Sequence, residues 1–485
     1  MSHEATSRQT ADDVQANDLL AQRPKNYAYR LLDSIGLITV HNSPTDAKLI
    51  LIQRFVRVFG YGLVALNLAA YLSALGFSDT QIGIFFGLTL IGDFFMVLLL
   101  TQFAHVIGLK TVLVVGAVLM TMSGVVFALA SNYWILLAAA VLGVLSPSAT
   151  EVGPFKTIEE GALFNVVIRN VVDVMAWYGT AEFLSTALGI AACGAIMAFL
   201  QSSRFSWTFV SACRAVFAIY AGIGVLKIIL SSCLSEQIET QITSKDGGPQ
   251  ERRGQPQSSP SPPATAIVAE DEPLLSSLAA SSLDSETSVH KQGFSVLSLD
   301  SKERLLLLKL CVLQATDSIS VGLSSVPWQT YFVRTRFGLS SSSLGTIFFF
   351  GSMLSAAGTM TSVSLSRRLG NMVTLATTYG PAGLVMLFFG LPSTPPPLVF
   401  LLLLQAFLDD IYLAPRNTLI GRILTPINGF GSFLTGVLAD RGLFWLVFVI
   451  AGSLKMVYVC AMLWTFLAVD RRLTAEIDGR DDDRD

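Results

Sequence analysis

Two short stretches of the chain share a pattern that decides the fold: GFSDTQIG at residues 76–83 and GLSSSSLG at residues 338–345. Both begin and end with glycine, and each is followed by a long apolar run. The two copies lie 262 residues apart, and the same offset relates Gly60 to Gly322, Ile107 to Leu369, Gly108 to Gly370 and Leu113 to Leu375. One offset without gaps predicts two copies of a single structural unit that run in the same direction.

The composition indicates a membrane protein. Of the 485 residues, 52% are hydrophobic and only 14% are charged, whereas a soluble domain carries about 25% charged residues. The formal net charge of −3 gives no overall attraction to nucleic acid. We therefore expect a polytopic protein in the lipid bilayer.

Twelve apolar runs come close to the roughly 20 residues that a helix needs to cross a bilayer. They cover residues 58–76, 81–104, 109–130, 134–152, 174–200 and 207–230 in the first half, and 305–327, 341–365, 370–391, 397–413, 418–438 and 443–467 in the second. The predicted fold class is all-α, with twelve transmembrane helices in two parallel six-helix repeats.

The rest of the chain divides into tails and a loop. We expect an N-terminal tail at 1–48, helical bundles at 49–230 and 303–467, and an acidic tail at 468–485. Residues 231–302 are rich in serine, proline and acid, which is typical of a disordered loop. Lys and Arg gather in the tails and this loop, so the positive-inside rule places all three in the cytoplasm. Arg204, Arg334 and Arg336 are exceptions.

Nothing in the sequence suggests an enzyme. The five cysteines and four histidines are scattered, so no metal site is expected. Nucleotide-binding and hydrolase motifs are absent from the sequence, and we expect no cofactor. Without an ATP motif, an ion or solute gradient must supply any driving force.

Several motifs resemble a fungal branch of the major facilitator superfamily. They are Leu75–Gly83, Arg54–Arg57 before Tyr61, Ser146–Lys156 with Glu159 and Glu160, Ala176–Tyr178, Ala414–Arg416 and Gly436–Trp445. The resemblance implies alternating access, in which two six-helix halves rock around a site near the midplane. Two departures stand out: His105–Lys110 lacks the usual acidic and paired basic residues, and little more than Leu413–Thr418 joins two of the predicted helices.

Ionisable residues inside the spans are the first candidates for function, because charge in a bilayer is costly. The carboxylates Asp93, Glu182, Asp317, Asp409 and Asp410 could each bind a proton in alternation with substrate. The alternative is a structural ion pair between helices, or a side chain that extends to the interface. The structural alternative is preferred for three other residues, Glu151, Arg214 and Lys455.

A stripe at the start of the first span is a second candidate. Arg57 lies one helical turn after Arg54, and Tyr61 one turn further, so the stripe could meet an anionic substrate. For Arg54 we expect contact with lipid phosphate instead. Trp177, Tyr178 and Trp328 could stack on a solute ring, but anchoring at the membrane interface is the more common role.

These observations predict a secondary transporter that acts on a small organic solute, works as a monomer and uses protons as its coupling ion. Because the fungal branch resembles multidrug and metabolite exporters, efflux of a drug-like compound or secondary metabolite is the first choice. Uptake of a nutrient or organic acid by proton symport is the alternative. A membrane sensor or scaffold that transports nothing is a third reading. The plasma membrane is the expected location, with a vacuolar or other internal membrane as alternative.

Overall fold

The computed structural model describes residues 37–143, 154–167, 171–235, 301–369, 371–409 and 425–482, and its regular elements there are all helices. The first half contains α3 (Leu37–Asn42), α4 (Thr45–Ala65), α5 (Leu68–Ala74), α6 (Asp79–Ile107), α7 (Leu109–Leu129), α8 (Tyr133–Leu142), α9 (Pro154–Val166), α10 (Val171–Leu200) and α11 (Phe209–Ser232). The second contains α14 (Ser301–Leu323), α15 (Val326–Phe337), α16 (Ser341–Leu369), α17 (Asn371–Leu387), α18 (Pro395–Asp409), α21 (Thr425–Asp440) and α22 (Phe444–Asp482).

The described helices suit a bilayer. By length and composition, α6, α7, α10, α11 and α22 can each span a membrane, and α4 with α5 form a sixth span that bends by 42°. Large apolar side chains lie exposed along them, such as Phe95, Met122, Phe199 and Trp464. In lipid such side chains need no burial, whereas backbone groups must be paired within helices.

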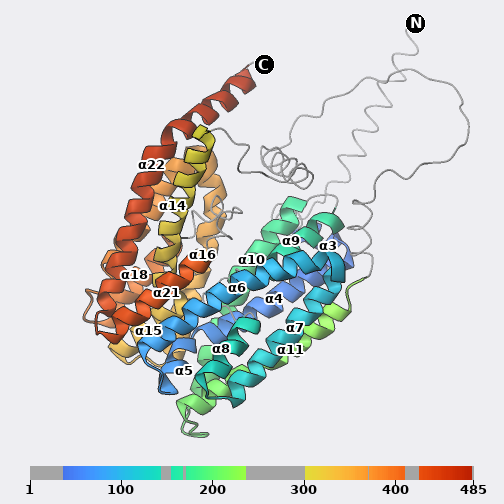
Figure 1. The fold of residues 1–485 in the computed structure, drawn as a ribbon, viewed down its shortest axis with the longest axis vertical. Helices are drawn as coiled ribbons and strands as arrows, with labels where there is room; N and C mark the ends of the chain where they lie inside the picture. Colours follow the sequence, from blue (N-terminus) through green and yellow to red (C-terminus); the bar gives the residue numbers. More distant parts are fainter. Residues whose placement is uncertain are drawn as a thin grey trace, which may run out of the picture.

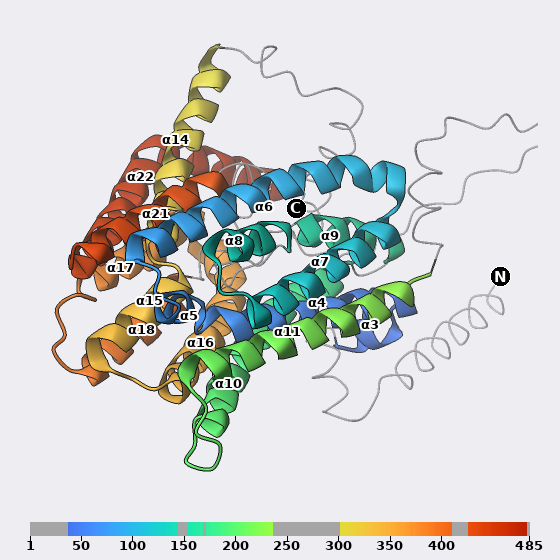
Figure 2. The same cartoon turned by 60° about the horizontal axis from the view of Figure 1, so that its bottom comes forward.

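The helices form two groups that meet at one end (Figures 1 and 2). Helices α3 to α11 make one group and α14 to α22 the other, and the groups touch chiefly where α6 packs on α21, α10 on α16 and α5 on α15. We call this the distal end; it contains the turns before α6 and α16. At the opposite, terminal end, α11 finishes and α14 begins.

Glycines allow the two main contacts between the groups. A Cβ added to Gly83 would lie 2.8 Å from Cα of Gly436, and one added to Gly345 would lie 2.9 Å from Cα of Gly194. Such short separations require a residue without a side chain. Gly83 and Gly345 therefore hold the same place in the two repeats, as their offset of 262 predicts.

One pairing from the sequence is wrong. Gly62, not Gly60, corresponds to Gly322, because a Cβ on Gly62 would meet the Thr186 carbonyl at 2.4 Å and one on Gly322 would meet the Asn428 carbonyl at 1.9 Å. The offset changes from 260 to 262 because the second half carries two more residues between this glycine and the distal turn: Gly338 follows Gly322 by 16 positions, whereas Gly76 follows Gly62 by 14.

The break in the second half lies at residues 324–325, between α14 and α15. It leaves carbonyls at the end of α14 without helical partners. Hydroxyls of α21 supply them: Ser432 donates to the carbonyl of Gly322 at 2.8 Å, and Thr435 donates to that of Leu323 at 2.9 Å. Helix α21 thus supplies the hydrogen bonds that the broken helix lacks, and it stabilises the shape of the break.

Several predictions fall on residues outside the described part of the chain. These are most of the 1–48 tail, most of the 231–302 loop, Glu151, Asp410 and the link between the spans predicted at 397–413 and 418–438.

Candidate functional site

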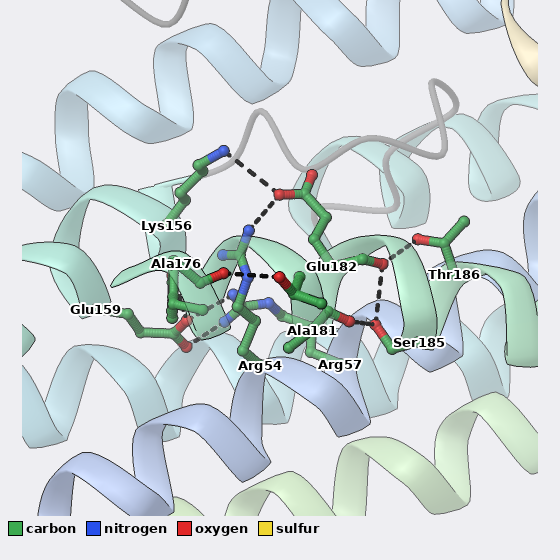
Figure 3. A network of polar contacts seen from close by, with 11 residues as sticks. Arg54, Arg57, Lys156, Glu159, Ala176, Ala181, Glu182, Ser185 and Thr186 are labelled. Carbon is green, nitrogen blue, oxygen red and sulfur yellow. Dashed lines mark hydrogen bonds and ion pairs between the residues drawn. The ribbon is translucent and has the colours of Figure 1, made fainter. Parts of the chain in front are cut away.

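A buried ion pair joins α4 and α9 inside the first half (Figure 3). Arg57 on α4 donates to both carboxylate oxygens of Glu159 on α9, with Nη2 2.7 Å from Oε2. The Tyr178 hydroxyl donates to the same Oε2 at 3.0 Å. Both charged side chains are 0% exposed. A two-pronged arginine–carboxylate pair fixes the geometry as well as the charge.

A second pair lies one turn away on α4. Arg54 donates to Glu182 on α10, and its guanidinium lies 3.7 Å from the centre of the Tyr178 ring. Lys156 approaches the same Glu182 oxygen at 3.5 Å. Arg54 is 0% exposed, so the predicted contact with lipid phosphate is wrong: α10 supplies a carboxylate that the sequence alone does not place beside it. We call these six side chains the arginine network: Arg54, Arg57, Lys156, Glu159, Tyr178 and Glu182.

Lys227 extends the charged layer from α11. Its Nζ lies 4.2 Å from the centre of the Phe155 ring, and the side chain is 1% exposed. Tyr61, predicted to continue the Arg57 stripe, is buried too, and its ring centre lies 6.5 Å from that of Tyr220. Arg57 and Tyr61 therefore face the interior of the first half in this conformation.

Asp93 on α6 is buried with neither carboxylate oxygen hydrogen-bonded to any of the described residues. It is 1% exposed. Beside it, a Cβ on Gly92 would lie 2.5 Å from a Val141 methyl group, so this glycine allows α6 and α8 to approach closely. A buried charge normally has a partner, so an isolated carboxylate is suited to carrying a proton.

The second half contains its own polar cluster. Tyr379 on α17 donates to Asp317 on α14, which is 0% exposed. Lys455 on α22 forms an ion pair with Asp409 on α18, and Gln405 donates to the other Asp409 oxygen at 3.2 Å. The structural reading of Lys455 is confirmed. Its Nζ also lies 4.6 Å from the Tyr379 ring centre, which links the two contacts.

Hydrogen bonds join the two halves at the distal end, where α5 and α6 face α15 and α21. The Tyr331 hydroxyl lies 3.1 Å from that of Ser73 and donates to Asp79 at 2.7 Å. The Thr80 hydroxyl donates to Asp440 at 2.8 Å. These bonds cross the contact between the two halves at the distal end.

A second set lies beside α10 and α16. Ser341 donates to Asn67 at 3.1 Å, Asn67 donates to the Cys193 sulfur at 3.2 Å, and Arg334 donates to Ser341 at 2.9 Å. The Arg334 guanidinium lies 4.0 Å from the Phe209 ring centre in the other half. Arg334 was an exception to the positive-inside rule in the sequence, and its contacts with Ser341 and Phe209 explain why an arginine is found there.

The structure thus separates the candidates into three places. Arg57 and Glu182 belong to the arginine network, Asp317 and Asp409 to the cluster of the second half, and Asp93 to neither. Sequence reasoning missed Glu159, Lys227 and Tyr379 as partners; Lys227 carried a usable signal, since it is a single lysine in an apolar run. Trp328, expected at a membrane interface, is 0% exposed inside the distal contact.

Comparison with known proteins identifies the class. The Major Facilitator Superfamily profile matches residues 50–428, and the chain belongs to that family. The protein is therefore a membrane-embedded secondary transporter with the major facilitator fold, and not an enzyme.

Individual proteins similar to this chain include a membrane protein and two transporters of known structure. Uncharacterized membrane protein YJR124C of Saccharomyces cerevisiae is 28% identical over 451 residues, which cover 89% of this chain and 96% of the relative. Among solved structures, the nucleoside transporter NupG has a TM-score of 0.57 at 14% identity, covering 87% of this chain and 99% of its own. A D-xylose-proton symporter has a TM-score of 0.60 at 12% identity, covering 87% and 97%.

Proposed function

We propose that this transporter moves a small organic solute in exchange or in company with protons, and that Asp93 is the proton-binding group. The observation that carries the proposal is a carboxylate that is 1% exposed in a spanning helix, with no hydrogen-bond partner among the described residues. Burial without a partner disfavours the charged form, so Asp93 is stable when protonated and needs water to release the proton.

Alternating access would provide that change. In the present conformation the halves contact at the distal end, through Gly83 and Gly345 and through the Tyr331 hydrogen bonds. If the halves rock and the distal end opens, α6 moves relative to α21, and the surroundings of Asp93 on the same helix change. Proton release and solute release then belong to one movement.

Two candidate functions differ in the direction of transport. Efflux of a drug-like compound or secondary metabolite follows from the resemblance in the sequence. Uptake by proton symport is the second, because a protein of the same fold is a D-xylose-proton symporter. The plasma membrane remains our proposed location, and the monomer our proposed state.

Flux in proteoliposomes tests the proposal. Purified protein is reconstituted, a pH gradient is imposed in either direction, and a library of small solutes is screened for accumulation by mass spectrometry. We expect accumulation of at least one solute to depend on the gradient, and its sign to distinguish uptake from efflux. A protein that moves no solute in either orientation is a sensor or scaffold.

A further inference from the structure

A set of uncharged polar atoms without partners lies where helices from both halves meet. They are Oγ of Ser325, Nε1 of Trp328 and Oδ1 of Asn428; each is buried and has no hydrogen-bond partner among the described residues. Leaving such groups unpaired costs about 1–3 kcal/mol each. Helix packing alone does not explain why three unpaired polar atoms lie at one junction.

The three residues surround the break in the first span of the second half. Ser325 occupies the N-cap position of α15, yet its side chain makes no capping hydrogen bond. Trp328 follows one turn later. Asn428 is the fourth residue of α21, and its backbone carbonyl oxygen is the atom that a Cβ on Gly322 would meet at 1.9 Å.

Helix α6 of the first half closes the junction. The Phe86 ring centre lies 5.4 Å from that of Trp328, with the ring planes at 73°. A Cβ on Gly87 would lie 3.0 Å from the carbonyl of Gly429, next to Asn428. Since Phe86 and Trp328 belong to different halves, opening of the distal end would separate their rings and expose the side of the indole that Phe86 covers.

Charge is absent from the residues that form this junction. Along α6, Asp79 and Asp93 lie seven residues before and after Phe86, about 10 Å away in each direction. Asp79 already accepts a hydrogen bond from Tyr331. The acidic and basic side chains of the arginine network and of the Lys455 cluster are bonded within their own halves.

We infer that this junction is a substrate subsite for an uncharged, ring-bearing solute that presents a hydrogen-bond acceptor beside a donor, such as a lactam or primary amide. Trp328 donates to the acceptor, Asn428 accepts from the donor, and Ser325 does either. The ring takes the place of Phe86 against Trp328. An ionised solute would lose its hydration here without an opposite charge. The inference rests on the proposed function, since it names the substrate class.

Matched probes test the subsite by binding alone, with no gradient. Benzamide, benzoate and benzylamine share one ring and differ in charge, and uridine and orotidine form a larger neutral and anionic pair. Binding of each to the full-length chain in lipid nanodiscs is measured by calorimetry. We expect at least one neutral member to bind, and its charged counterparts to bind at least tenfold more weakly.

Variants connect that binding to the junction. Trp328→Phe keeps a ring but removes the N–H, and we expect it to weaken binding of the neutral probe roughly three- to tenfold, the effect of one lost hydrogen bond. Ser325→Ala removes a hydroxyl that caps nothing, so it tests the subsite even if Trp328→Phe does not fold. Trp445→Phe, at a side chain that is 47% exposed, is the control and should bind normally.

The inference is overturned if charged probes bind as well as neutral ones, if no probe binds, or if Trp328→Phe and Ser325→Ala both bind like the wild type. Failure of the proposed function is a separate result. A chain that binds neutral probes through Trp328 but transports nothing keeps the subsite and loses the transport proposal.

Discussion

The two halves of the molecule share a scaffold but place different charges on it. Helix contacts give the register, since Gly62 and Gly322 pack against equivalent points of α10 and α21. Arg57 then corresponds to Asp317, because the offset of 260 residues that relates Gly62 to Gly322 also relates these two positions. The same position on the first helix is an arginine in one half and an aspartate in the other.

A lysine stays the same in both halves. Gly224 on α11 packs against Thr121, and Gly452 on α22 packs against Gly383, which lies 262 residues after Thr121. This register makes Lys455 the counterpart of Lys227, and both are 1% exposed. The comparison teaches that the repeat conserves shape and one buried cation, while each half has its own ion pairs.

The largest contrast concerns Asp93. Its counterpart, 262 residues later, is Ser355, whose hydroxyl donates to the carbonyl of Ala406 at 3.1 Å. The second half thus has a small, bonded hydroxyl where the first has a carboxylate with no partner among the described residues. We propose that this difference assigns proton coupling to the first half.

The largest expected effect comes from breaking the arginine network. Arg57→Met leaves Glu159 charged and buried, which should lower the free energy of unfolding by about 3–5 kcal/mol. Arg57→Met with Glu159→Met removes both charges and should regain most of the loss. Thermal unfolding in nanodiscs measures both, with Arg214→Met, on an arginine bonded to exposed Ser131, as control. Equal melting of the single variant and the wild type would contradict the pair's importance.

An effect of intermediate size is expected from two alanine substitutions that test whether the contacts between the halves are symmetric. Gly83→Ala and Gly345→Ala each place a methyl group less than 3.0 Å from backbone of the other half, and overpacking costs about 1–3 kcal/mol. Both should open the distal end to a similar extent. The distance between spin labels at Ser203 and Ser393, measured by pulsed electron paramagnetic resonance, reports the opening. Gly222→Ala, where no atom lies within 4 Å, is the control; opening by only one of the two variants would break the symmetry.

The smallest effect concerns the distal hydrogen bonds. Tyr331→Phe removes the contacts with Ser73 and Asp79, worth about 1–2 kcal/mol together, so the distal-open population should rise roughly five- to thirtyfold. The same spin labels measure it. Tyr133→Phe is the matched control, since Tyr133 donates to the Gln81 carbonyl within one half. An unchanged distance distribution would show that these bonds do not hold the end shut.

Much of the fold could be predicted from the sequence, because apolar run length and a constant glycine offset are local signals. Gly76 and Gly338 show this: both adopt positive φ, at 94° and 64°, in equivalent turns. The shift from Gly60 to Gly62 could not be predicted, since it depends on where the broken helix bends.

The site was less predictable. An ionisable residue in a span is visible in the sequence, but its partner is set by packing between distant helices. Arg54 and Glu182 are 128 residues apart, and nothing local indicates that they meet. Asp93 stood out in the sequence as a carboxylate inside an apolar run; whether it couples protons stays a prediction.

One measurement tests that claim most directly: solute accumulation driven by a pH gradient, compared with solute exchange at equal pH, for Asp93→Asn, Asp317→Asn and Ser355→Ala in proteoliposomes. We predict that Asp93→Asn abolishes accumulation, because the amide cannot titrate, and retains exchange, while Ser355→Ala retains both. If Asp93→Asn accumulates solute like the wild type, Asp93 does not couple. Loss of accumulation in Asp317→Asn alone would move coupling to the second half and contradict the account.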